Sequence, residues 1–181
     1  FHKTMEAYFD AKKRLFDALT KSAPAVVNVD DPYGRRLAAD PALAGRLITF
    51  GCDPSARVRA SDLRLSETGS SFLAATPWGE VRVEMALAGR FNVMNALAAM
   101  AACGALGAPP ESMAAAFANM AAVPGRLERI ADSKGRHIFV DYAHTEDALR
   151  NVMQTLRENA PGRLICLFGC GGNRDRSKRP R

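Results

Sequence analysis

Two groups of polar residues in the last third of the chain follow short apolar runs, and their chemistry suits the binding of an anion. Asp141 and His144 follow the run at 138–140, and a glycine loop with several arginines follows the run at 164–168. Apolar residues at helical spacing fill 146–158 between them. The sequence therefore predicts a parallel strand pair joined by a helix, with both polar groups facing one crevice beyond the strand ends.

Positive charge is concentrated at the end of the chain. The formal net charge is +6, and residues 163–181 hold six Lys or Arg against one acid, Asp175. Cations gathered beside a glycine loop favour capture of a small phosphate or carboxylate, since a nucleic-acid surface spreads its charge over a face. A solvated basic tail, or a non-catalytic module that binds anions or nucleic acid, is the alternative for this segment.

Lys12 holds an unusual place in the amphipathic helix predicted for residues 4–19. It falls on the apolar stripe between Met5 and Leu15, where an ammonium group is costly to bury. One interpretation is that its stem packs while its head reaches water. The other is that burial favours a neutral amine that is available for chemistry.

The rest of the chain alternates predicted strands and helices. Asp31 and Pro32 are typical of a helix start, so the acids after the first strand are best explained as caps. Asn92 and Asn95 share one face of a helix's first turn, where capping is favoured over contact with a ligand. Trp78 is expected to be a partly exposed turn residue. The predicted strands are 25–29, 46–50 and 127–131, the antiparallel meander is 56–88, and the further helices are 32–39, 90–106 and 110–120.

The composition of the chain limits the classes of protein to which it can belong. At 48% hydrophobic residues the chain can bury a core, and it has no apolar run long enough for a membrane span. The four cysteines are scattered without a CxxC spacing, which favours reduced thiols in a cytosolic protein. The glycine loop fails the dinucleotide fingerprint because Arg174 replaces its third glycine. The first residue is not Met and the chain stops just after this loop, so we expect a fragment of a longer protein.

Six motifs occur in an order that resembles the Mur ligases, in the branch of UDP-N-acetylmuramoyl-tripeptide synthetases. The resemblance runs over essentially the whole chain. It implies an α/β fold: the later part of a central ATPase domain with an antiparallel meander at 1–125, then the start of a Rossmann-like domain at 126–181. The motifs lie at 5–12, 28–34, 89–95, 124–128, 141–145 and 169–180.

The resemblance also implies an activity. Such ligases use ATP to convert the terminal carboxylate of UDP-MurNAc-L-Ala-D-Glu to an acyl phosphate, which the amine of a diamino acid then attacks. The diamino acid is meso-diaminopimelate or L-lysine, with the former favoured on resemblance alone. The implied setting is peptidoglycan precursor synthesis by a cytoplasmic monomer, without a nucleic-acid or membrane partner. A fragment of this extent is expected to be inactive.

Site residues follow from the matching positions. Lys12 matches a lysine that carries a carbamate and helps to hold Mg²⁺. Arg174 matches an arginine that pairs with a carboxylate of the incoming amino acid. Position 173 is Asn where the family usually has Asp. The remaining matches place Asn92 and Asn95 by the adenine, Arg126 and His144 by the phosphates of ATP, and Asp141 by the ribose, with Lys12 and His144 as the catalytic residues.

Overall fold

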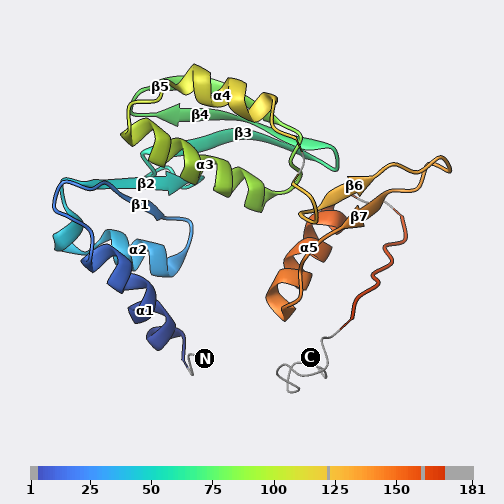
Figure 1. The fold of residues 1–181 in the computed structure, drawn as a ribbon, viewed down its shortest axis with the longest axis horizontal. Coiled ribbons are helices and arrows are strands. Elements are labelled where there is room, and N and C mark those ends of the chain that lie inside the picture. Colours follow the sequence, from blue (N-terminus) through green and yellow to red (C-terminus); the bar gives the residue numbers. More distant parts are fainter. Residues whose placement is uncertain (1–3, 122, 160–161, 170–181) are drawn as a thin grey trace.

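The computed structural model describes residues 4–121, 123–159 and 162–169, and these form a mixed α/β fold (Figure 1). The α/β class predicted from the sequence is confirmed, and each predicted helix is present. In chain order the elements are α1 Met5–Asp17, β1 Ala25–Asn28, α2 Pro32–Ala38, a 3-10 helix Pro41–Leu43, β2 Leu47–Gly51, β3 Val58–Ser66, β4 Gly69–Thr76, β5 Gly79–Met85, α3 Arg90–Ala105, α4 Pro110–Ala118, β6 Glu128–Ile130, β7 Ile138–Val140 and α5 Glu146–Asn159.

The larger sheet has the strand order β1-β2-β3-β4-β5. Strands β1, β2 and β3 pair in parallel, whereas β3, β4 and β5 form the antiparallel meander expected from residues 56–88. The register of β3 against β4 shifts between Ser61 and Arg64, and Asp62 adopts a positive φ of 47° at this irregularity. The parallel half of the sheet therefore places the carboxyl ends of β1 and β2 side by side.

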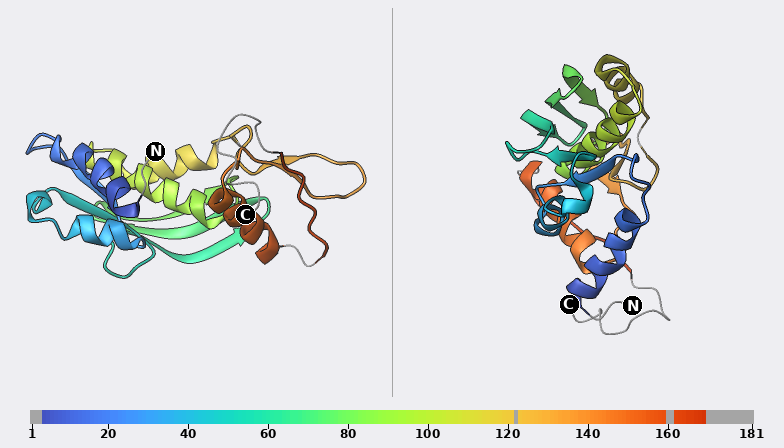
Figure 2. Two further views of the ribbon diagram at one scale, coloured as in Figure 1. Left: turned by 90° about the horizontal axis from the view of Figure 1, so that it is seen from below. Right: turned by 90° about the vertical axis from the view of Figure 1, so that its left-hand side faces the viewer.

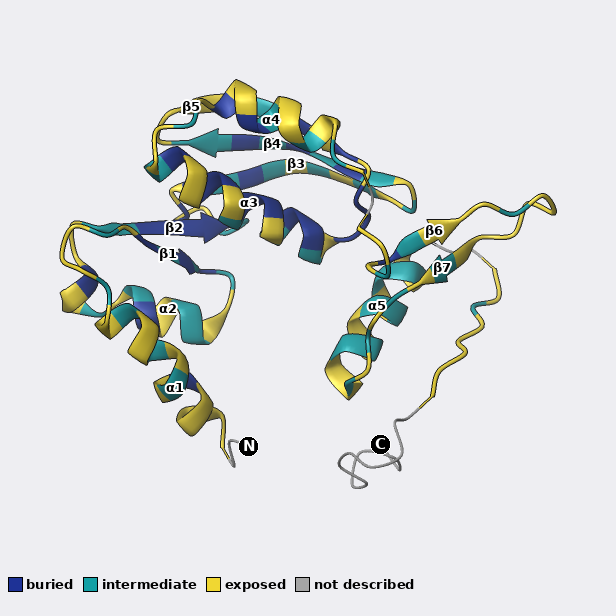
Figure 3. Ribbon diagram, in the orientation of Figure 1, coloured by how far each residue is buried: buried dark blue, intermediate teal, exposed yellow. Residues whose placement is uncertain are grey.

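Helices α3 and α4 cover one face of this sheet (Figure 2). Val93, Leu97 and Met100 of α3 are fully buried, because apolar side chains at this spacing form one face of a helix. They pack in the same cluster as Val58 and Phe72 of the sheet. Figure 3 shows this buried layer as the dark core of the molecule.

A smaller core joins α1 and α2 to the outer strand β1. Phe9 is the buried residue of α1, and it packs with Val27 and Leu37. Both helices begin at side-chain caps: Thr4 accepts a hydrogen bond from the Ala7 amide, and Asp31 accepts from the amides of Tyr33 and Gly34. The expected cap at Asp31 is confirmed, but Asp30 does not cap α2, because its carboxylate accepts hydrogen bonds from the Cys52 and Asp53 amides.

The second, smaller sheet departs from the prediction. Strand β7 pairs with β6 in antiparallel register, with Glu128 opposite Val140, and residues 162–169 form no strand. The predicted parallel pair of 138–140 and 164–168 is therefore wrong. Ile165 and Leu167 are 74% and 98% exposed. An apolar run becomes a strand only where another strand satisfies its backbone groups, and in the described ranges β7 is paired with β6 alone.

Contacts within the described residues join the smaller sheet and α5 to the larger sheet and its helix α3. Nδ1 of His137, just before β7, lies within hydrogen-bonding distance of a carboxylate oxygen of Glu67 in the turn between β3 and β4. Gly89, at the start of α3, lies so close to α5 that a Cβ atom there would come within 3.0 Å of Thr155 Cγ2. None of the helices in the described ranges combines the length and hydropathy needed to cross a membrane.

Trp78 makes a close contact that can be tested. Its side chain is 37% exposed, as expected for the turn, and its ring lies against Gly104 of α3, where an added Cβ would come within 2.2 Å of the indole. In an open helix, replacing Gly by Ala stabilises by about 1 kcal/mol. Here we expect Gly104→Ala to destabilise the fold by about 1–3 kcal/mol, because the rigid ring must move.

Urea unfolding followed by circular dichroism measures this effect. In a Trp78→Ala background, where the ring is absent, the same glycine substitution should become stabilising. Stabilisation by Gly104→Ala in the presence of Trp78 would contradict the packing described.

Candidate functional site

Two loops meet at the start of the smaller sheet, and Asp141 joins them. Its Oδ2 accepts a hydrogen bond from the Leu127 amide at 2.7 Å, and its Oδ1 accepts from the Ala143 amide at 2.7 Å. The Tyr142 amide donates to the Gly125 carbonyl at 2.8 Å. One carboxylate thus fixes the loop that carries Arg126 against the loop that carries His144.

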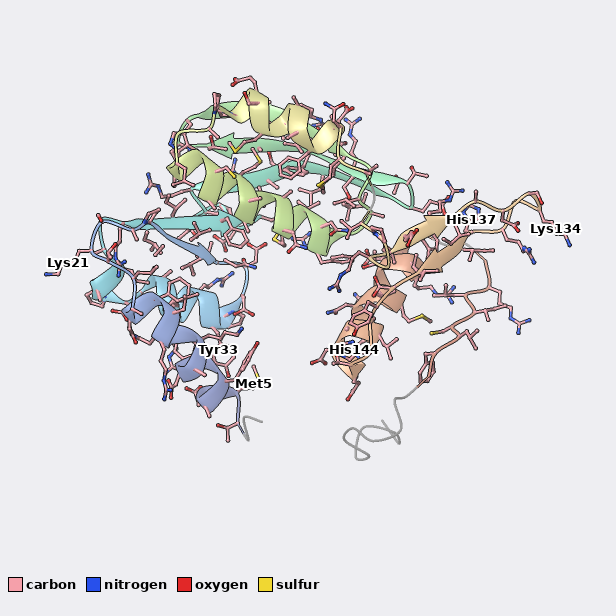
Figure 4. The ribbon with its side chains drawn as sticks, in the orientation of Figure 1. Met5, Lys21, Tyr33, Lys134, His137 and His144 are labelled. Carbon is pink, nitrogen blue, oxygen red and sulfur yellow. The ribbon has the colours of Figure 1, made fainter. Side chains whose placement is uncertain are left out.

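Arg126 and His144 both lie close to the Tyr142 ring. The Arg126 guanidinium carbon is 5.8 Å from the ring centroid, and the His144 ring meets it edge-on at 5.1 Å. Nδ1 of His144 is 3.0 Å from the Tyr142 carbonyl oxygen. Both side chains are exposed, and Figure 4 shows His144 beside α5. A fixed cation beside an exposed imidazole suits the binding of a phosphate.

Asn92 and Asn95 lie in the first two turns of α3, but neither caps the helix. Gly89 is the N-cap residue, and no side chain donates or accepts there. Asn92 is 7% exposed and its amide nitrogen donates to the Ala88 carbonyl at 2.8 Å, whereas Asn95 is exposed. The expected capping role is therefore wrong, because both residues lie past the cap position. The amide of Asn95 faces solvent.

Lys12 is exposed, so the expectation that it lies on a buried face is wrong. The stripe of α1 buries only Phe9, because the remainder of the stripe extends past the small core beneath it. The Lys12 amine lies 5.4 Å from the centroid of the Tyr8 ring. It borders a hollow of about 250 Å³ between α1 and α2, which Asp31 and Tyr33 also line.

The residues around this hollow do not make up a magnesium site. Asp31 already accepts two backbone hydrogen bonds as the cap of α2. Nowhere in the described ranges do three or more His, Cys, Asp or Glu residues gather as metal ligands, and Mg²⁺ requires near-octahedral oxygen coordination. Lys12 is also separate from the loops of Arg126 and His144: Figure 1 shows α1 and the smaller sheet apart in the fold.

A separate cavity of about 480 Å³, lined by polar residues, was not anticipated from the sequence. It lies at the carboxyl ends of β1 and β2, beside the first residue of α3, where ligands of parallel sheets bind. Asp30 closes its floor by accepting hydrogen bonds from the Cys52 and Asp53 amides at 2.9 Å. The cavity is lined by Asp30, Arg35, Cys52, Asp53 and Arg90.

Two pKa values in this cavity are displaced by their surroundings. Hydrogen bonds from the Ser55 side chain and amide, with the nearby Arg35 charge, hold the pKa of the Asp53 carboxyl below its ordinary value. Burial raises the pKa of the Cys52 thiol. Asp53 also pairs with Arg35 at 3.1 Å, so the cavity holds balanced charges at neutral pH.

The structure thus brings Arg126, Asp141 and His144 together and leaves Lys12 apart from them. Arg174 lies outside the described residues. Asp30 and Asp53 each follow a strand, and this position could have marked them as candidate site residues. The sequence did not identify their partners Cys52 and Arg35, because these are distant along the chain.

Comparison with known proteins gives two family matches. Residues 1–103 match the Mur ligase middle domain, and residues 125–181 match the Mur ligase, glutamate ligase domain. A protein of Geobacter metallireducens named UDP-N-acetylmuramoyl-L-alanyl-D-glutamate–2,6-diaminopimelate ligase is 46% identical over 99% of this chain and 36% of its own length. The chain spans about 36% of the length of the curated relatives it matches.

Solved structures show the same likeness. A structure of UDP-N-acetylmuramoyl-L-alanyl-D-glutamate–2,6-diaminopimelate ligase superposes with a TM-score of 0.70 at 35% identity, over 99% of this chain and 37% of that one. MurF from Acinetobacter baumannii gives a TM-score of 0.78 at 23% identity, over 88% of this chain and 34% of that one. The second likeness concerns the fold alone.

The charge balance of the polar cavity can be tested through Ser55. Removing its hydroxyl in Ser55→Ala should raise the pKa of Asp53, because the strongest hydrogen bond to the carboxylate is lost. A carboxyl whose folded pKa is depressed stabilises the fold above its unfolded pKa, and that stability is lost as the pH falls through the folded pKa. Ser55→Ala should therefore weaken the dependence of stability on acid pH.

The measurement is an NMR titration of the Asp53 side-chain carbonyl. Ser66→Ala, which removes a serine hydroxyl in the distant β3–β4 turn, is the matched control and should leave the value unchanged. An identical Asp53 pKa in Ser55→Ala and the parent would show that Ser55 does not hold this carboxylate.

Proposed function

Because the chain belongs to the Mur ligase family, we propose that the protein containing it is an ATP-dependent ligase of peptidoglycan precursor synthesis. It joins meso-diaminopimelate to UDP-MurNAc-L-Ala-D-Glu through an amide bond. The observation that carries the proposal is the 46% identity, along 99% of this chain, to a relative named as a 2,6-diaminopimelate ligase. L-Lysine is the alternative third amino acid.

The proposed reaction has two steps. An oxygen of the substrate's terminal carboxylate attacks the γ-phosphorus of ATP, so that an acyl phosphate forms and ADP leaves. The free amine of the incoming amino acid then attacks the acyl carbon, the amide bond forms, phosphate leaves and the nitrogen loses a proton. The protein's main tasks in such phosphoryl chemistry are to position the reactants and to stabilise charge. Members of the family use ATP together with Mg²⁺.

The loops around Tyr142 support a role in binding ATP. In our proposal, the guanidinium of Arg126 and the imidazole of His144 contact the phosphates, and both are exposed on a backbone that Asp141 fixes. Each carboxylate oxygen of Asp141 accepts one described backbone hydrogen bond, and an ionised carboxylate has about four acceptor positions. The Asp141 carboxylate can therefore accept a further hydrogen bond, from a ribose hydroxyl.

The remaining assignments rest on matching positions in the family. We assign Asn92 and Asn95 to the adenine, which the solvent-facing amide of Asn95 favours. Arg174 is assigned to a carboxylate of the incoming amino acid, since a guanidinium pairs with a carboxylate through two hydrogen bonds. We place the domain boundary between residues 125 and 126, with ATP between the two domains. The protein acts as a cytoplasmic monomer in this proposal.

Lys12 is proposed to carry a carbamate. The neutral amine adds CO₂ and loses a proton, which replaces a cation with an anion that presents two oxygen atoms. The exposed amine borders the hollow between α1 and α2, and the assignment rests on the matching position in the family.

The ligase proposal is tested by supplying the full-length protein with UDP-MurNAc-L-Ala-D-Glu, ATP and Mg²⁺. We expect phosphate release with meso-diaminopimelate and only background release with L-lysine. Release with L-lysine alone would correct the substrate. No release with either amino acid, from protein that is folded by circular dichroism, would contradict the ligase.

The Lys12 assignment is tested by Lys12→Ala in the same full-length protein. We expect at least a hundredfold loss of activity, comparable to the loss of one charge-stabilising group in other enzymes, and partial rescue by short carboxylic acids that replace the carbamate. Intact-mass measurement under CO₂ should find the added mass on the parent and not on the variant. Lys13→Ala, which removes the neighbouring amine, is the control, and activity of Lys12→Ala equal to the parent would refute the assignment.

A further inference from the structure

We propose that Glu128 is a positioning residue that holds Arg126 ready for the phosphates of ATP, an inference that rests on the proposed function. Glu128 opens β6 and is half-buried. Its Oε2 accepts a hydrogen bond at 2.7 Å from the amide of Gly125, which lies three residues earlier. The side chain therefore folds back over its own turn and closes the loop that presents Arg126.

Four backbone groups around Arg126 are held by hydrogen bonds. The Gly125 amide is bound by Glu128 and the Gly125 carbonyl by the Tyr142 amide. On the other side, the Leu127 amide is bound by Asp141. The amide of Arg126 itself donates to the Val123 carbonyl at 3.0 Å. Before Arg126, the hydrogen bond that the Gly125 amide donates to Glu128 is the one in this set that involves a side chain.

The turn needs such support because its backbone is strained. Leu127 has a positive φ of 48° and Gly125 one of 67°. A left-handed conformation is unfavourable for a leucine, and it persists only where surrounding contacts enforce it. The Leu127 side chain is buried, with 6% exposed, so the turn has an apolar anchor as well. Loss of the Glu128 bond would free the Gly125 amide and allow the turn to relax.

Glu128 holds the loop without neutralising Arg126. In the described ranges no carboxylate lies within ion-pair distance of Arg126, and the described hydrogen bond of Glu128 goes to backbone. The guanidinium carries its full charge toward a phosphate, with the Tyr142 ring on one side. What Glu128 contributes is therefore an acceptor oxygen at one place, a requirement that a glutamine amide can also meet.

This distinction gives the test, in the full-length protein with the ligase assay. Glu128→Ala should raise the KM for ATP by roughly tenfold or more, the usual range for a lost hydrogen bond to a charged acceptor, with a smaller change in kcat. Glu128→Gln should restore the KM to within about threefold of the parent, since it keeps the acceptor. Glu111→Ala, on the exposed start of α4, is the matched control and should leave the KM unchanged.

A readout independent of activity is hydrogen exchange of the peptide that contains Gly125. Exchange should be faster in Glu128→Ala than in the parent and slow in Glu128→Gln. Should Glu128→Ala fail to fold, Glu128→Asp takes its place, because it keeps the charge but is too short to reach the amide. An unchanged KM for ATP in Glu128→Ala, or a Gln variant as impaired as the Ala variant, overturns the proposal.

Arg126→Ala separates this inference from the function beneath it. A raised KM for ATP in Arg126→Ala, with none in Glu128→Ala, refutes only the positioning role. A parent-like KM in Arg126→Ala refutes the assignment of Arg126 to ATP, and the positioning role with it. If the parent protein is inactive but shows the predicted exchange pattern, the ligase proposal is refuted. The structural claim that Glu128 closes the turn at Gly125 then still stands.

Discussion

The contact that the larger part of the molecule depends on is the burial of α3 against the five-stranded sheet. Val93, Leu97 and Met100 exclude water from the centre of the sheet, and each such side chain contributes about 1.5–3 kcal/mol when fully buried. Because that face is fixed, the first turn of α3 must lie at the carboxyl ends of β1 and β2. The polar cavity of Asp30 and Arg90 and the exposed amide of Asn95 are consequences of one apolar interface.

The smaller sheet is held by different forces. Its strands are three residues long, and Ile138 and Val140 remain 38% and 47% exposed. Here two carboxylates, those of Glu128 and Asp141, bind backbone amides and set the loops that carry Arg126 and His144. Hydrogen bonds to charged groups are directional and short. They therefore fix the position of a functional side chain where there is little apolar surface to bury.

Local patterns predicted the local elements well. The alanine-rich run of α3, the Asp31–Pro32 start of α2 and the alternation in β3–β5 each specify a structure within a few residues, and the structure has them. The predictions that failed concern residues whose environment is set by parts of the chain that are distant in sequence. Lys12 fits an apolar stripe, but the core beneath α1 covers only Phe9. Residues 164–168 have the composition of a strand, but in the described ranges β7 pairs with β6 instead of with them. Asp30 bonds the Cys52 amide across 22 residues, which no short motif encodes.

The contact between His137 and Glu67 has a mechanical consequence. It joins the smaller sheet to the β3–β4 turn, and its side chains are 52% and 30% exposed. A solvent-exposed pair contributes at most about 1 kcal/mol, which is less than the burial of a single core side chain such as Leu97 under α3. Force on the hairpin of β6 and β7 would therefore break this contact before it disturbed the interface between α3 and the sheet.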